Sequence, residues 1–140
     1  MAVHLDQPVA RTSAAYWWRV ITIFLVADIF IQSAFAGAML SGVEWAHRAH
    51  MANALLAVGA AFLASAAAIV MLRRVRNGRK LGFLLLGLAV TALVELMLGK
   101  MTARGENLLW AHVPLGVILV GLAGQAVASA RKLGEDAGGT

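Results

Sequence analysis

The sequence contains no cysteine and few charged side chains. The absence of cysteine from all 140 residues excludes disulfide bonds, thiolate metal sites and covalent attachment of a c-type haem. Only 14% of the residues are charged, whereas a soluble domain has about a quarter. Apolar residues make up 61% of the chain, which is typical of an integral membrane protein.

Four apolar segments are long enough to cross a bilayer, which takes about 20 mostly apolar residues. They span approximately residues 16–40, 47–72, 81–98 and 108–130. Apolar residues occur on all sides of these segments, and the connections between them are too short for a soluble domain. The sequence therefore predicts one transmembrane domain over residues 1–140, folded as an all-α integral membrane four-helix bundle.

Basic residues are unevenly distributed among the connections. The central connection is rich in them and has no acid. Further basic residues lie near the start of the first segment and just after the last one. By the positive-inside rule, the central connection and both termini are expected to be cytoplasmic, in a multi-pass protein of the inner or plasma membrane. The same bias explains the net charge of +5, so we predict no nucleic-acid partner. The apolar segments are expected to contact membrane lipid.

The two halves of the sequence are related by an internal repeat. An offset of 62 residues places Glu44 on Glu106 and His50 on His112, and it also matches glycine and methionine positions. A competing offset of 65 matches Trp45-Ala46-His47 to Trp110-Ala111-His112. The bundle is therefore predicted to consist of two repeated helical hairpins. Whether His47 or His50 is the counterpart of His112 stays open.

These histidines are candidate metal ligands. His112 lies a few residues inside the fourth segment, where an ionisable side chain is a functional candidate by default, with an interfacial histidine as the alternative. The second and fourth segments run parallel, so imidazoles near their starts lie at similar depth and can ligate a haem iron from both faces. His47 and His50 point about 60° apart, so one of them is the expected partner of His112.

Other polar residues near these histidines have two interpretations each. Glu44 precedes His47 by one turn and either orients its imidazole or is simply an acid favoured at a helix start. Arg48 and Arg104 are candidate donors to haem propionates, or solvated loop charges. Asp28 and Glu95 lie deeper, where a proton path, a quinone headgroup or a structural hydrogen bond would explain them.

The stretch Glu44-x-x-His47-Arg48 resembles the E-x-x-H-R motif of the haem A synthase family. In that family, one four-helix half carries a histidine there and another at the outer start of its fourth helix, where Leu109-Trp110-Ala111-His112 lies. The resemblance covers roughly residues 20–130 and implies His47 and His112 as paired haem ligands and Glu44 as a functional carboxylate. A haem A synthase has two such halves, and this chain has one.

Three functions are compatible with these patterns. The first is a b-type cytochrome that holds haem b noncovalently and passes electrons between a quinone and a redox partner, since two axial histidines leave no open position on the iron. The second is a haem-modifying or quinone oxidoreductase, in which a homodimer supplies both halves and Glu44 handles protons. The third is a membrane accessory subunit without a cofactor. Whether the protein is an enzyme therefore stays open.

Overall fold

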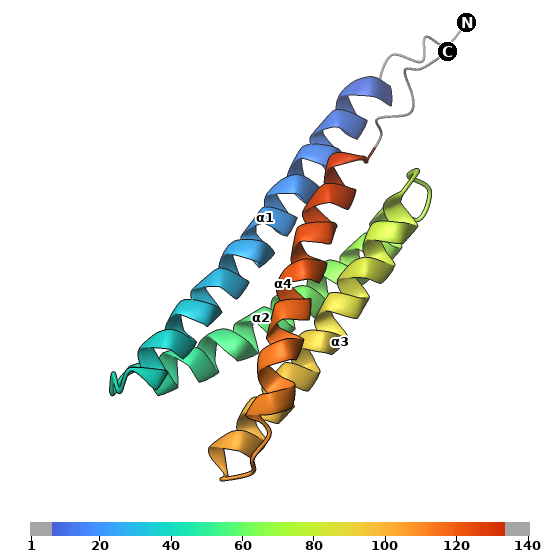
Figure 1. Cartoon of the computed structure of the whole chain (residues 1–140). Helices are drawn as coiled ribbons and strands as arrows, with labels where there is room; N and C mark the ends of the chain where they lie inside the picture. The colour runs from blue at the N-terminus through green and yellow to red at the C-terminus, as the bar shows by residue number, and fades with distance from the viewer. Residues whose placement is uncertain (1–6, 134–140) are drawn as a thin grey trace, which may run out of the picture.

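The computed structural model describes residues 7–133, and side chains from residue 14 onward. Within that part of the chain, all the regular structure is helical, and all four helices are long and apolar enough to span a membrane. The predicted all-α, four-helix membrane architecture is confirmed. The helices are α1 (Gln7–Leu40), α2 (Ala46–Met71), α3 (Gly78–Ala103) and α4 (Leu109–Arg131), shown in Figure 1.

Helix α3 extends beyond the predicted apolar segment 81–98 at both ends, and α1 begins well before residue 16. The difference has a simple cause. Hydropathy marks where side chains become polar, but the backbone hydrogen bonds of a helix continue through residues such as Lys100 until a turn ends them. Here the turn is made by Gly105, whose φ of 96° lies in the left-handed region that favours glycine.

Each helix packs against its neighbours in the chain, and α4 closes the ring against α1 (Figure 1). Helices α2 and α4 are therefore diagonal to each other and run parallel. We call the end that carries the α1–α2 and α3–α4 connections (residues 41–45 and 104–108) the two-turn end, and the opposite end the terminal end. The two hairpins, α1–α2 and α3–α4, diverge towards the two-turn end (Figure 1).

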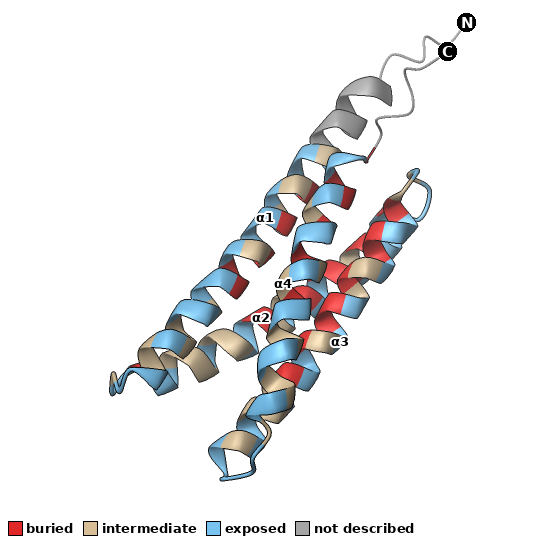
Figure 2. Ribbon diagram, viewed as in Figure 1, coloured by how far each residue is buried: buried red, intermediate tan, exposed pale blue. Residues whose placement is uncertain are grey.

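Burial differs between the two ends of the bundle (Figure 2). From the middle to the terminal end, leucines of α3 such as Leu81, Leu85 and Leu88 are fully enclosed by alanine-rich faces of α2 and α4. Towards the two-turn end, buried residues are sparse: apart from Ala46 at the start of α2, the helical segments contain none. These segments are residues 30–40, 46–56, 96–103 and 109–118.

Glycines bring α2 and α3 into close contact near the terminal end. A Cβ on Gly82 would lie 2.8 Å from Cγ1 and 3.2 Å from the backbone nitrogen of Ile69. The hydroxyl of Ser65 donates a hydrogen bond to the carbonyl oxygen of Gly82 at 3.3 Å. Small residues at such a crossing allow the backbones to approach. The resulting van der Waals packing is one of the sources of helix association in lipid. This contact fixes how α2 is rotated against α3.

Substituting Gly82 by valine should destabilise the bundle by about 1–3 kcal/mol relative to Gly87→Val, because the added atoms overpack the α2–α3 contact. Gly87 is the matched control, since it lies on the same helix with open space around its Cβ position and bears the same change in helix propensity. Unfolding by SDS titration in detergent measures both variants. Equal free energies of unfolding would show that the α2–α3 contact does not depend on Gly82.

Candidate histidine site

His50 lies on the second turn of α2 and is held by α1. Its Nδ1 lies 3.2 Å from the backbone carbonyl oxygen of Gln32, and its Nε2 lies 3.3 Å from the side-chain nitrogen of Gln32. A carbonyl oxygen only accepts a hydrogen bond, so Nδ1 is the donor and Nε2 carries the lone pair. The half-buried imidazole is thereby fixed in orientation by the neighbouring helix.

His112 lies on the second turn of α4 and is held by α3. Its Nδ1 contacts the carboxylate oxygen Oε2 of Glu95, a side chain that is only about one-tenth exposed. This ion-pair contact turns Nδ1 towards α3 and leaves Nε2 for another partner. A Cβ on Gly99 would lie 3.5 Å from Cε1 and 3.8 Å from Nε2 of His112, which is ordinary van der Waals contact, so this edge of the ring lies close to α3.

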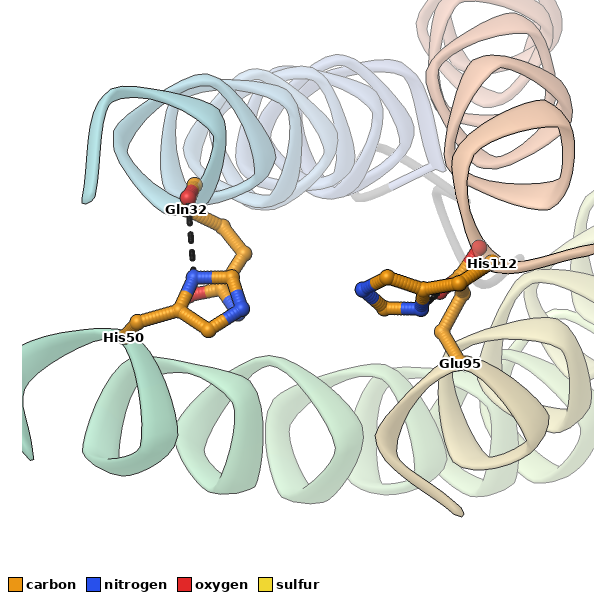
Figure 3. A network of polar contacts seen from close by, with 4 residues as sticks. All are labelled: Gln32, His50, Glu95 and His112. Atoms are coloured by element: carbon orange, nitrogen blue, oxygen red, sulfur yellow. Dashed lines mark hydrogen bonds and ion pairs between the residues drawn. The ribbon is translucent and has the colours of Figure 1, made fainter. Parts of the chain in front are cut away.

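The two imidazoles face one another across the interior of the bundle (Figure 3). They come from the diagonal helices α2 and α4, near the two-turn end where the hairpins diverge. Each is anchored through Nδ1 by the helix that precedes it in the chain, His50 by α1 and His112 by α3. The arrangement repeats between the hairpins, in keeping with the sequence offset of 62 that pairs His50 with His112.

The other predicted site residues lie outside this pair. His47 and Arg48 are exposed on the first turn of α2, and Glu44 is exposed in the connection before it. Arg104 is exposed just after α3, at the same end of the bundle. The structure therefore brings His50 and His112 to face one another, while His47 and Glu44 are exposed.

Sequence reasoning missed both partners of the histidines. It singles out Glu95 only as a deep acid and does not single out Gln32, and it pairs neither with His50 or His112. A signal for the pairing exists in the repeat: in each hairpin a polar residue precedes the turn and a histidine follows it. Gln32 and His50 flank one turn much as Glu95 and His112 flank the other.

A second buried acid lies one turn deeper on α1. Asp28 is 4% exposed, and its backbone carbonyl oxygen accepts a hydrogen bond from the side-chain nitrogen of Asn53 at 3.2 Å. Its Oδ2 has no hydrogen-bond partner among the described residues. Asp28 and Asn53 lie one turn further from the two-turn end than Gln32 and His50. They extend the polar interior towards the middle of the bundle.

Within the described part of the chain, no three histidine, aspartate or glutamate side chains form a group that could hold a metal ion by themselves. His50 and His112 instead form a pair of imidazoles that face one another. A comparison of the chain with protein-family models, with curated proteins and with solved structures finds no match. The function must therefore be argued from this site.

The contact between Glu95 and His112 should appear as an energetic coupling in a double-mutant cycle. Glu95→Ala and His112→Ala each leave a polar partner stranded, so the double variant should lose less stability than the two single variants together, with a coupling of about 0.5–3 kcal/mol. SDS unfolding in detergent without added cofactor measures the coupling. The control cycle of Glu95→Ala with His47→Ala should be additive, because His47 is exposed on another helix. Coupling of equal size in both cycles contradicts the pairing.

Proposed function

We propose that the protein is a small integral membrane b-type cytochrome that binds one haem b noncovalently between His50 and His112. The observation that carries the proposal is the pair of imidazoles facing one another from diagonal helices, each with Nδ1 anchored and Nε2 turned inward. Anchoring of Nδ1 by a carbonyl or carboxylate is the usual means by which proteins orient a metal-binding histidine. Two such ligands suit a six-coordinate haem iron.

The surroundings of the two histidines fit a haem. Apart from Ala46, the helical segments towards the two-turn end contain no buried residue, and we propose that the haem lies between these segments. The amide of Gln32, which now lies against Nε2 of His50, must turn away when that atom binds a metal. Arg48 and Arg104, exposed at the same end, are the proposed donors to the propionates.

The proposed activity is transfer of single electrons. Haem b, when bound, would supply one-electron chemistry, and His50 and His112 would hold it. The neighbouring helices α1 and α3 hold the two imidazoles in place. The proposed partners are a quinone, which is soluble in the same membrane, and a second redox protein.

The choice of His50 as second ligand departs from the haem A synthase resemblance, which implies His47. His47 is exposed, whereas His50 is half-buried and faces His112. The haem-modifying alternative also assigns proton handling to Glu44, which is exposed in the connection before α2. Both features favour electron transfer over the haem-modifying homodimer.

We further propose that both termini and the central connection are cytoplasmic, which places the histidines in the outer half of a cell membrane. The basis is the concentration of basic residues in that connection.

Absorption spectra of the purified protein, oxidised and dithionite-reduced, test the haem proposal. Wild type expressed with ample haem supply should show a sharp reduced α band. His50→Ala and His112→Ala should lose this band, and His47→Ala should keep it, because only the first two supply the facing imidazoles. Loss of the band in His47→Ala with retention in His50→Ala would make His47 the ligand. A wild-type protein that binds no haem would show that the cytochrome proposal is wrong.

The absence of native cysteine gives a direct test of orientation. A single cysteine at Ser41, which is exposed in the α1–α2 connection, should react with a membrane-impermeant maleimide in intact cells. A single cysteine at Arg74, which is exposed in the central connection, should react only after the membrane is permeabilised. The reverse pattern would place the termini outside.

A further inference from the structure

The two facing histidines have chemically different partners. Nδ1 of His50 is held by a neutral backbone carbonyl, that of Gln32. Nδ1 of His112 is held by the carboxylate of Glu95, which is 8% exposed. The two hairpins are otherwise built alike, so this difference distinguishes one ligand from the other.

We propose that Glu95 is a positioning residue that acts through His112 and lowers the reduction potential of the bound haem. The inference rests on the proposed function, because it concerns the same pair of ligands. It adds a determinant of redox behaviour that neither the E-x-x-H-R motif nor the repeat identifies.

The physical reason is the charge of the partner. A carboxylate that accepts the Nδ1 proton makes the imidazole more basic and a stronger donor through Nε2. A stronger donor stabilises ferric iron more than ferrous iron, and so does a nearby negative charge in a poorly screened interior. Both effects disfavour uptake of an electron and therefore lower the potential.

The surroundings of Glu95 direct this effect to His112. Oε2 contacts the imidazole, and Oε1 accepts no hydrogen bond within the described part of the chain. A Cβ built on Gly116, one turn after His112, would lie 3.6 Å from Oε1. The carboxylate is thus packed between α3 and α4 with its second oxygen against a glycine. Its negative charge therefore acts on His112, the polar group that it contacts.

Potentiometric titration of the haem-loaded protein in detergent tests the role of Glu95. Glu95→Gln keeps the shape of the side chain and removes its charge. At a fixed potential we expect the ratio of reduced to oxidised haem to rise at least tenfold, which corresponds to about 59 mV for a one-electron couple. Asp28→Asn is the matched control, because it makes the same acid-to-amide change at another buried acid on a different helix. We expect its effect to be less than half as large.

The outcomes separate this inference from the cytochrome proposal. If Glu95→Gln binds haem with an unchanged midpoint, or if Asp28→Asn shifts it equally, the role of Glu95 is refuted while the cytochrome stands. A wild-type protein without haem refutes the cytochrome and this inference with it.

A second measurement decides the matter if Glu95→Gln fails to fold or to hold haem. Nitrogen-15 NMR of the histidine rings in the wild-type, haem-free protein should show a strongly deshielded proton on Nδ1 of His112, and His47 serves as the reference. A proton on Nε2 of His112 instead would overturn the inference.

Discussion

A bilayer offers no water to an unpaired backbone amide, and this constraint governs the whole structure. Each segment satisfies its own backbone as a helix, so the contacts that set one helix against another must come from side chains. Some polar groups bond within their own helix, as the hydroxyl of Thr22 does with the carbonyl of Trp18 at 2.9 Å. Gln32 and Glu95 instead reach histidines on the next helix, and so tie each hairpin together.

The two ends of the bundle contribute differently to this arrangement. At the terminal end, Arg19 donates to the carbonyl of Arg131 at 3.0 Å, and Asn77 donates to the carbonyl of Lys132 at 3.4 Å. Together with the α2–α3 contact at Gly82, these bonds join α4 to α1 and to the α2–α3 connection. At the two-turn end the two hairpins diverge (Figure 1). This divergence places two histidines opposite one another without bringing them into contact.

The four helices and their membrane character follow directly from the length of the apolar segments. Which of His47 and His50 faces His112 does not follow from it. In a helix that is apolar all round, hydrophobicity does not mark the inward face. Residue size does: α2 buries small residues and exposes large ones such as Leu55, Leu56 and Leu63. The small-residue stripe continues back through Asn53 and His50, and misses His47. Its buried members are Ala46, Ala57, Ala61, Ala64 and Ala68.

The rotation of α2 determines which of the two histidines faces His112. Bringing His47 to the position of His50 requires a turn of about 60° around the helix axis. The helix turns as one body, so the same rotation would move Ser65 away from the carbonyl of Gly82 and drive a different face of α2 into the close contact there. Packing near the terminal end thus determines which imidazole faces His112 near the other end. The sequence motif around His47 carries no information about that contact, and so the resemblance and the packing select different residues.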